Sequence, residues 1–515
     1  MGNRFICYLV NSFCSLLYMK EYQDFINIKD IRAVQNEKLA GILSSNKSSE
    51  YGKLYGFGDI KTIKEFQERV PLRDYEEYKP YIEKIKRGEK RILTSEDVLL
   101  LELSSGSTSA SKLIPYTKAL KEEFQKGIKP WLYDLYSSYK GIKWGRSYWS
   151  VTPAATRNQY TEGGIPIGFE DDKEYFGALE KKLLDVIFAV PSDAAKTDNI
   201  EEFYYKTALG MLNCRYLTLI SVWNPSLLIL ILEYMHKNSE KLAKDIALKD
   251  SRRAKEVKRW LNEKDFGKLW KNLKVISCWC DANAKIYADR LKGIFPQSAM
   301  QPKGLLATEG FVSFPLYSAG GAVLSVKSHF FEFEEAGDSR ILLADQLEKG
   351  KEYSVILTTS GGFYRYRLKD VIQVTGFKGK IPVIKFLGKQ DKVSDLFGEK
   401  LNELFVKGLL ERHMIDKGFF MLAPEIDRYV LYVEAGKVTG GMEDRIEEAL
   451  RENFHYDYCR KLGQLKSLRV FSLTGNPEKE YLDECVRRGQ RLGNIKPVTL
   501  NLQGGWDKVF RGEYL

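Results

Sequence analysis

The sequence predicts an α/β protein with a large N-terminal α/β domain that carries a β subdomain, followed by a small C-terminal α+β domain. Its 515 residues are enough for two or more domains with full hydrophobic cores. Segments with helical periodicity alternate with short apolar runs as far as Thr308, where closely spaced β-like stretches begin. A polar, charge-rich segment at residues 388–392 (GKQDK) then precedes a second alternation of helices and strands.

The first part of the chain is predicted to be mainly helical. Dense charge at helical spacing runs from residue 20 to residue 92, with breaks at glycines and at Pro71. A β-like segment follows at residues 88–101. Residues 119–139 have apolar side chains at spacings of three and four, which predicts an amphipathic helix. Pro130 inside that segment predicts a kink or a break into two helices.

The next part is predicted to alternate helices with short strands. Residues 144–152 are expected to form a strand, and the sequence between residues 174 and 270 has the pattern of helices. Residues 271–280 (KNLKVISCWC) form a short apolar run of the kind that is buried in parallel sheets. The other expected elements are helices at 175–188, 200–211, 225–237 and 284–295, and a second short strand at 304–308.

A β subdomain and a separate C-terminal domain are predicted beyond Thr308. The β-rich stretches are 322–328, 353–359, 363–366, 371–375 and 383–387. The C-terminal elements are a helix at 401–417, a strand at 428–433, a helix at 443–453, a strand at 467–473 and a helix at 477–488. A hinge near Asp391 therefore divides the chain into domains at 1–390 and 391–515, and the smaller one is expected to be mobile.

Composition and charge exclude several classes of function. The formal charge of +11 is a small excess of 80 basic over 69 acidic residues, and no nucleic-acid-binding module is recognisable. Seven scattered cysteines predict reduced thiols and a cytoplasmic protein, since disulfide frameworks use paired cysteines in small secreted domains. Cys278 and Cys280 form a Cys-x-Cys pair, but with four histidines in the chain no thiolate–imidazole metal site is expected.

No segment predicts a membrane partner. Residues 5–19 are apolar-rich, but polar residues interrupt the run and no small-residue cleavage site follows, so a packed N-terminal helix is expected. The apolar stretch at 227–235 is far shorter than the roughly 20 residues that cross a bilayer.

The most informative stretch for function is residues 101–117, LELSSGSTSASKLIPYT. Small hydroxyl residues and one glycine at 104–109 lie between apolar segments, and Lys112 follows three positions later. Such a loop can surround phosphate oxygens with backbone N–H groups and hydroxyls, while the lysine adds a positive charge. The spacing is not that of a Walker A loop. Taken alone, the stretch is more often a flexible Ser-rich turn between two strands than a phosphate-binding loop.

Three later positions fit a nucleotide site but have ordinary readings as well. Glu309 follows Thr308 at a strand end and is able to carry Mg²⁺ beside phosphate oxygens, or simply to be an exposed or paired acid. Asp370, in the segment YRYRLKD, is suited to accept hydrogen bonds from a ribose diol. It is equally compatible with an ordinary strand that ends in exposed charges. Lys496 lies in a C-terminal loop, GNIKP, where a surface lysine is the usual interpretation.

Four motifs in a fixed order connect these positions. The segments are SSGSTSASKLIPYT, SVWNPS, LLATEGFVSFPL and GGFYRYRLKDVIQVTGF. Together they resemble the Gretchen Hagen (auxin-responsive promoter) family of acyl acid amido synthetases, most closely its bacterial branch, within the adenylate-forming enzyme superfamily. The resemblance extends from about residue 70 to the C-terminus. It implies the adenylate-forming fold, with the small C-terminal domain moving against the large one.

The resemblance implies a role for each matched position. The phosphate loop corresponds to Ser104, Ser105, Gly106, Ser107, Thr108 and Lys112. The adenine-contacting and ribose-contacting positions correspond to Asp281, Ala282, Asn283, Thr308, Asp370 and Phe386. Glu309 corresponds to the Mg²⁺ contact, and Lys400 and Lys496 correspond to the basic residues that the small domain brings to the nucleotide. The sequence departs from the superfamily at Ser109 and Lys369, where glycine is usual, and at Lys389, where arginine is usual.

The implied activity is the ATP- and Mg²⁺-dependent joining of a carboxylic acid to an amine, expected to be an amino acid. The acid is first converted to acyl-AMP, with Lys496 as the residue expected to assist that step. Rotation about Asp391 would then admit the amine. Alternative functions are an acyl-CoA ligase and a catalytically weak protein that binds a nucleotide or an acyl-adenylate. Trp131, Trp223 and Phe311 are candidates for the acyl pocket by composition, and core packing is the competing interpretation for each.

Overall fold

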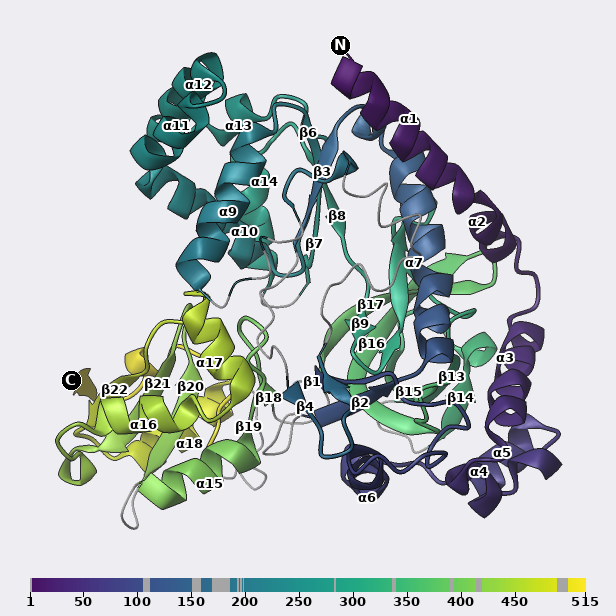
Figure 1. The fold of residues 1–515 in the computed structure, drawn as a ribbon. Helices are drawn as coiled ribbons and strands as arrows, with labels where there is room; N and C mark the ends of the chain where they lie inside the picture. Colours follow the sequence, from purple (N-terminus) through teal and green to yellow (C-terminus); the bar gives the residue numbers. More distant parts are fainter. Residues whose placement is uncertain are drawn as a thin grey trace. The chain divides into compact units, whose positions relative to one another are not determined.

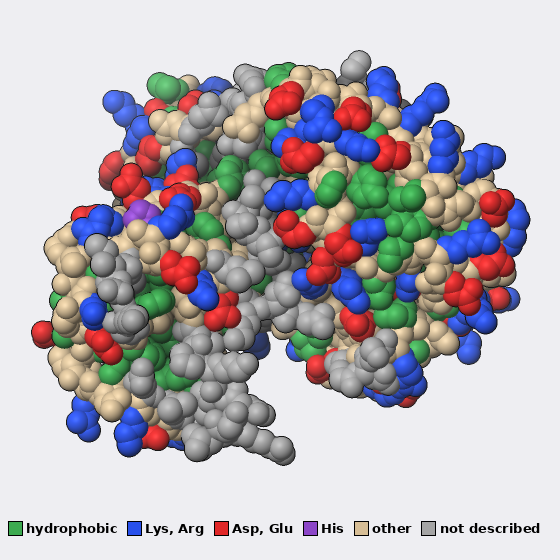
Figure 2. All heavy atoms as spheres, turned by 90° about the horizontal axis from the view of Figure 1, so that it is seen from below, with side chains coloured by type: hydrophobic (Ala, Val, Ile, Leu, Met, Phe, Trp, Pro, Cys, Tyr) green, Lys and Arg blue, Asp and Glu red, His purple; other side chains and the backbone are tan. Residues whose placement is uncertain are grey.

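The computed structural model describes residues 2–104, 112–150, 159–168, 186–191, 194, 197, 199–281, 284–335, 340–389, 393–413, 419–488 and 499–515 (Figure 1). The chain forms two compact units. The larger contains Met1–Ser104 and Leu113–Gln390, and the smaller contains Ser105–Lys112 and Asp391–Leu515. Within the described part of the chain, no helix combines the length and the apolar character needed to span a membrane. On the face drawn in Figure 2, Lys and Arg side chains are interspersed with Asp and Glu.

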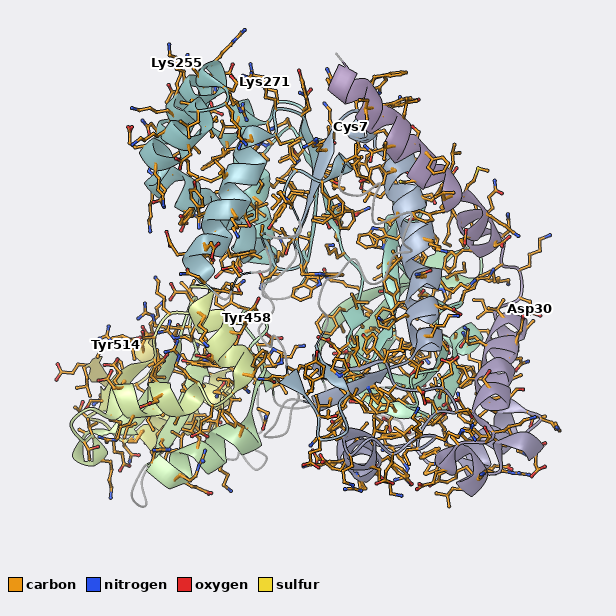
Figure 3. The ribbon with its side chains drawn as sticks, viewed as in Figure 1. Cys7, Asp30, Lys255, Lys271, Tyr458 and Tyr514 are labelled. Carbon is orange, nitrogen blue, oxygen red and sulfur yellow. The ribbon has the colours of Figure 1, made fainter. Side chains whose placement is uncertain are left out.

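The larger unit begins with six helices, in agreement with the predicted helical segment. They are α1 (Gly2–Leu17), α2 (Met19–Ile26), α3 (Ile31–Asn46), α4 (Glu50–Leu54), α5 (Ile63–Arg69) and α6 (Tyr75–Lys86). Side-chain caps define several of their starts: the Asp30 carboxylate, at the beginning of α3 in Figure 3, accepts the Ala33 N–H. Helix α1 packs through a face that carries Cys7 and Asn11, while Phe5 is exposed on its other side.

Helix α7 (Lys118–Ser138) is continuous, so of the kink or break predicted at Pro130 the break into two helices is wrong. Proline removes only one backbone hydrogen bond of the helix. The turns on either side are held by buried side chains, including Phe124 before the proline and Leu135 after it. Tertiary packing therefore outweighs the local preference for a break.

A four-stranded parallel sheet forms one part of the larger unit. Its order is β3 (Arg146–Trp149), β6 (Leu217–Ser221), β7 (Val275–Cys278) and β8 (Ala299–Pro302). The helices α9 (Ile200–Asn213), α10 (Pro225–Lys237), α11 (Ser239–Ala247), α12 (Ser251–Asn262), α13 (Phe266–Leu269) and α14 (Lys285–Ile294) are grouped beside it in Figure 1. The prediction that residues 174–270 are helical is wrong at β6, which lies within that range. Every residue of β6 is buried, so it lacks the alternation by which half-buried strands are recognised. The helix expected at 175–188 lies mostly outside the described residues.

A seven-stranded sheet, antiparallel at its paired strands, forms the β subdomain. Its order is β11 (Ser313–Leu316), β12 (Gly321–Leu324), β17 (Ile381–Lys389), β16 (Tyr366–Lys378), β15 (Glu352–Thr358), β13 (Phe330–Glu335) and β14 (Ile341–Leu343). Residues 363–365 were predicted as strand but precede β16. Arg365 has a φ of 52°, a left-handed conformation that does not continue a strand, and its guanidinium forms a buried pair with Glu332.

Two small sets of strands flank the predicted phosphate loop and the Thr308–Glu309 segment. The strands β2 (Lys112–Tyr116), β1 (Leu100–Ser104), β5 (Pro166–Ile167) and β4 (Gln159–Tyr160) form a sheet in that order. The hairpin of β9 (Leu306–Ala307) and β10 (Gly310–Phe311) has Thr308 and Glu309 at its turn.

The smaller unit is an α+β fold. Its main sheet has the order β20 (Phe420–Pro424), β21 (Tyr429–Glu434), β22 (Arg469–Leu473) and β23 (Gly512–Tyr514), and β18 (Val393–Ser394) pairs with β19 (Leu401–Asn402). The helices are α15 (Glu403–His413), α16 (Met442–Leu450), α17 (Phe454–Lys461) and α18 (Pro477–Arg487). The predicted alternation is present, with β20, α17 and β23 in addition. The location of the domain boundary and the motion about it stay predictions.

Candidate active site

The predicted site residues are distributed over both units, and several lie outside the described residues. Those outside are Ser105, Gly106, Ser107, Thr108, Ser109, Ala282, Asn283 and Lys496. The larger unit holds Ser104, Trp131, Trp223, Asp281, Thr308, Glu309, Phe311, Asp370 and Phe386, and the smaller unit holds Lys112 and Lys400. The roles assigned to all of them stay predictions; the structure describes their surroundings.

The two ends of the predicted phosphate loop are anchored on neighbouring strands. Ser104 is the last residue of β1 and Lys112 is the first residue of β2, and these strands are adjacent in their sheet. Tyr75, at the start of α6, binds the next residue: its hydroxyl accepts the Leu113 N–H at 2.7 Å. The base of the Ser-rich segment is therefore fixed by a tyrosine from a distant part of the chain.

Glu309 is a buried carboxylate among tyrosines. Its side chain is only 5% exposed, and the Tyr366 hydroxyl donates to its Oε1 at 3.2 Å. Burial, and then the negative charge of Glu309, raise the pKa of Tyr366 well above its ordinary value, so this phenol stays a donor at any physiological pH. Tyr116 fixes the neighbouring backbone, because its hydroxyl donates to the Thr308 carbonyl at 2.7 Å.

Glu309 suits a magnesium contact. Mg²⁺ is commonly held by one or two carboxylates together with substrate phosphates. Within the described ranges no group of three or more Asp, Glu, His or Cys side chains is placed to bind a metal by itself. A single buried carboxylate at the turn of the β9–β10 hairpin fits an ion that arrives with a nucleotide.

Asp370 lies near the same tyrosine. It is 3% exposed on β16, and its charge adds to the burial and the Glu309 carboxylate that raise the pKa of Tyr366. Asp370 lies within a β-bulge, because the register of β15 against β16 shifts between Ser354↔Val371 and Ile356↔Arg367. The acid predicted for ribose therefore lies on the same strand as the tyrosine that binds the acid predicted for the metal.

The unusual Lys369 occupies the bulge beside Asp370. Its φ is 63°, in the left-handed region where glycine is favoured, so a lysine here carries backbone strain. Its Nζ lies 3.0 Å from Oδ2 of Asp74, the residue that caps α6. The lysine that stands where glycine is usual is therefore held in an ion pair at the start of α6.

The adenine-side residues of the larger unit come from two elements. Asp281 is half-buried after β7; burial raises its pKa, and the positive charge of Lys385 opposes that rise. Lys385 precedes the half-buried Phe386 on β17, and Phe386 faces Ile372 of β16. Asp281 and the strand that carries Phe386 are therefore within electrostatic reach of each other.

Two of the three acyl-pocket candidates converge on a residue that sequence reasoning missed. Trp131 and Trp223 both lie against the ammonium group of Lys303, whose Nζ is 4.8 Å and 4.0 Å from their ring centroids. Phe311 lies in a different cluster, with its ring 6.1 Å from that of Phe124. The feature of the sequence that could have identified Lys303 is its position within the largely apolar run AMQPKGLLA.

A second missed cluster supports the backbone at Phe311. The Phe311 N–H donates to Nε2 of His329 at 2.8 Å, and Nδ1 of the same ring lies 3.0 Å from Oε2 of Glu123. Ser360 donates to that carboxylate through both its N–H and its hydroxyl. The imidazole therefore carries its proton on Nδ1 and is neutral. The hydrogen bonds of His329 and Glu123 therefore connect α7, β10 and the Ser360 turn.

In the smaller unit, Lys400 follows a buried carboxylate. Glu399 accepts the backbone N–H groups of Leu396 and Phe397 and the hydroxyl of Tyr429. Lys400 itself is half-buried with a φ of 43°. The turn that presents Lys400 is thus shaped by hydrogen bonds to its neighbour.

Three family models match successive parts of the chain. They are the GH3 family N-terminal domain over residues 24–300, the central domain over 322–389 and the C-terminal domain over 411–503. The first match alone spans more than half of the 515 residues. The chain belongs to the GH3 family. The family resemblance seen in the four sequence motifs is confirmed.

The chain is similar to plant members of this family along most of its length. Indole-3-acetic acid-amido synthetase GH3.4 of Arabidopsis thaliana is 24% identical over 461 residues, which cover 79% of this chain and 75% of the relative. Jasmonoyl–L-amino acid synthetase GH3.5 of Oryza sativa subsp. japonica is 22% identical over 545 residues, covering 91% and 92%. The solved structure of GH3.15 acyl acid amido synthetase matches with a TM-score of 0.63 at 20% identity, covering 98% of this chain and 96% of that one. The predicted fold class is confirmed by this likeness.

Proposed function

We propose that this protein is an ATP-dependent acyl acid amido synthetase. It activates a carboxylic acid as an acyl-adenylate and transfers the acyl group to an amine, expected to be an amino acid. The observation that carries the proposal is the hydrogen bond between buried Glu309 and Tyr366, which lies on the same strand as buried Asp370, in a member of the GH3 family. The names of the plant relatives, which are amido synthetases for indole-3-acetic acid and jasmonate, support the same reaction class.

The chemistry proceeds in two displacements. An oxygen of the substrate carboxylate attacks the α-phosphorus of ATP, and the bond to pyrophosphate breaks. The amine then attacks the acyl carbon, AMP leaves and the amine loses a proton. Activation is needed because a carboxylate is a poor electrophile, whereas the adenylate has a good leaving group.

Each predicted residue has a role in this proposal. Glu309 would hold Mg²⁺, which neutralises charge on phosphate oxygens. Asp370 would accept hydrogen bonds from the ribose hydroxyls. The Ser-rich segment and Lys112 would surround the phosphates, and Lys400 and Lys496 would reach the nucleotide from the smaller unit. Asp281, Thr308 and Phe386 would contact the adenosine.

The finer assignments belong to the same proposal. We place the protein in the bacterial branch of the family on its sequence motifs. We also expect a cytoplasmic enzyme whose partners are a small carboxylic acid and an amino acid, with neither nucleic acid nor membrane. The smaller unit is expected to move between the two steps.

The decisive experiment measures pyrophosphate exchange into ATP with a panel of carboxylic acids, followed by product analysis with different acceptors. Exchange that depends on an acid, together with amide formation from an amino acid, is the expected result. Thioester formation with CoA in place of amide formation would make the protein an acyl-CoA ligase. Nucleotide binding without exchange for any acid would make it a binding protein and would overturn the proposal.

A further inference from the structure

Helix α1 turns its larger apolar side chains away from the protein. Six of them are between 42% and 58% exposed: Phe5, Ile6, Leu9, Phe13, Leu16 and Leu17. With 3.6 residues per turn, these six positions fall within a sector of about 120° around the helix axis. We call this sector the outer stripe. It carries no charge, because α1 contains no acidic residue and its one basic residue, Arg4, lies over the Tyr216 ring at 5.0 Å.

The opposite side of α1, which packs on the protein, is the less apolar one. Its buried residues include Cys7, Asn11 and Ser15. The Asn11 amide donates to the backbone carbonyls of Lys143 and Gly145 at 2.9 Å and 3.0 Å. Figure 1 shows the helix along the outer edge of the larger unit, in contact with α7. Rotation of α1 to bury the outer stripe would break both hydrogen bonds, so the helix is fixed with this stripe facing outward.

This distribution is the reverse of that in an ordinary surface helix, which buries its apolar stripe and exposes its polar side. The outer stripe exposes about 600 Å² per chain, taking roughly 200 Å² for a fully exposed side chain of this size. Contiguous apolar patches of more than a few hundred Å² mark sites of interaction with proteins or membranes. The outer stripe is therefore a candidate interaction surface.

The spacing within the outer stripe fits a partner helix. Ile6, Leu9, Phe13 and Leu16 follow one another at intervals of three, four and three residues, which is the seam by which two helices pack together. Helices that lie on a membrane surface instead combine their apolar face with a polar face rich in lysine and arginine. The other side of α1 has small polar residues and is packed on the protein. A helix is thus favoured over a lipid surface.

The outer stripe is also complementary to itself. Its residues form three pairs that are equally spaced about Asn11: Phe5 with Leu17, Ile6 with Leu16, and Leu9 with Phe13. Two copies of α1 that cross antiparallel at the level of Asn11 therefore place every residue of one stripe opposite a residue of the other. A two-fold interface requires a patch of this kind. The pair would bury about 1,200 Å² in total, above the roughly 1,000 Å² expected of a specific interface.

We propose that the outer stripe of α1 is a dimer interface and that its partner is the same stripe of a second copy of this chain. The two α1 helices pack antiparallel, with Leu9 and Phe13 of each copy at the centre. The contact buries apolar side chains and no charge, as in the central part of stable homodimer interfaces. This inference is independent of the proposed function.

The test measures the mass of the full-length protein in solution by light scattering and by sedimentation over a wide range of concentration. The wild type is expected to have twice the chain mass of 59.3 kDa. Leu9→Asp and Phe13→Asp each place a carboxylate at the centre of the interface, so the dimer dissociation constant should rise about 100-fold or more. Both side chains are half exposed within one chain, so the circular dichroism spectrum should not change.

A matched control is Leu248→Asp. Leu248 follows α11 and is 84% exposed, so it is an apolar surface residue outside the outer stripe. Its replacement should leave the protein dimeric.

Cysteine cross-linking tests the antiparallel arrangement. A Leu9→Cys protein mixed with a Phe13→Cys protein should form a disulfide between the two chains when oxidised glutathione is added. Either protein alone should form no more cross-link than the wild type, because a disulfide requires its two Cα atoms to lie within about 7 Å of each other. Mass spectrometry of the joined peptides identifies the bond. A cross-link between two copies of Leu9→Cys would contradict the antiparallel arrangement.

Four other results would overturn the inference. A wild type that has the mass of one chain at every concentration would contradict it, whether or not the variants fold. A dimer that persists in both aspartate variants would place the interface elsewhere. Equal dissociation in Leu248→Asp would show that the effect is not specific to α1. Binding of a monomeric wild type to vesicles of phosphatidylcholine and phosphatidylserine, lost in Leu9→Asp, would assign the outer stripe to a lipid surface.

Discussion

The two main sheets of the larger unit treat buried charge in different ways. Beside the seven-stranded sheet, Arg365 forms a two-pronged ion pair with Glu332 of β13, and Glu123 of α7 contacts His329. At the edge of the parallel sheet, Lys303 lies against tryptophan faces. An ion pair fixes two chain segments in one geometry. Aromatic faces attract a cation without fixing the direction of its N–H bonds. The first arrangement orients both charged groups of a pair, and the second stabilises the cation through tryptophan faces and the Ser221 hydroxyl.

The largest effect is expected from breaking the Arg365–Glu332 pair. Arg365→Met leaves a fully buried carboxylate without its cation, and the unfolding free energy should fall by about 3–5 kcal/mol. Denaturant unfolding of the full chain measures this loss. Arg340→Met is the matched control, because Arg340 pairs with Glu335 but its side chain is 64% exposed; a loss of under about 1 kcal/mol is expected. Similar losses in both variants would contradict the scaffold role of the buried pair.

The smaller unit extends the comparison to a carboxylate that is solvated by hydrogen bonds. Burial, assisted by the nearby Asp395, raises the pKa of Glu399 to about 7. Because the folded state holds this proton more tightly than the unfolded state, the stabilisation is complete below the ordinary carboxyl pKa. It is lost as the pH rises through about 7. The unfolding free energy of the smaller unit should fall by about 3 kcal/mol over that window. The Glu399→Gln variant should lack this slope, and an identical slope in both proteins would contradict the assignment.

Glu309→Gln tests whether the acid at the β9–β10 turn serves chemistry and not the scaffold. Acid-dependent pyrophosphate exchange should fall by about 100-fold, with a raised requirement for Mg²⁺, because an amide is a poor ligand for a hard cation. The melting temperature should change little. Tyr366→Phe, which removes the donor to Glu309, should give a smaller loss of about 10-fold. Unchanged exchange in Glu309→Gln would remove this residue from the site.

The smallest of these effects is expected at His329. His329→Leu leaves the Phe311 N–H without its acceptor and removes one donor to the Glu123 carboxylate, which keeps the two from Ser360, and the unfolding free energy should fall by about 1–3 kcal/mol. Exchange should fall through misplacement of the neighbouring Glu309, and higher Mg²⁺ should restore part of it. His329→Gln, which retains a polar side chain, should recover part of the stability. Equal stability in His329→Leu and the wild type would contradict the scaffold role of this cluster.

Much of the fold was predictable because its elements have clear local patterns. The helical N-terminal part, α7 and the alternation in the smaller unit all follow from spacing of apolar residues. The strands β6 and β8 were missed because short, fully buried or irregular segments carry no period. The break expected at Pro130 did not occur because packing of α7 outweighs one missing hydrogen bond.

The sequence by itself determined the family and the identities of Glu309 and Asp370, because both lie in continuous motifs that local reading can recognise. Only the tertiary structure decided that Glu309 binds Tyr366, that Lys369 pairs with Asp74, and that three tryptophans from separate elements surround Lys303. The physical reason is that these contacts join residues far apart in the chain. No local spacing encodes them, and they exist only once the sheets and α7 have packed. Burial, which makes each of these charges consequential, is likewise a property of the packed chain.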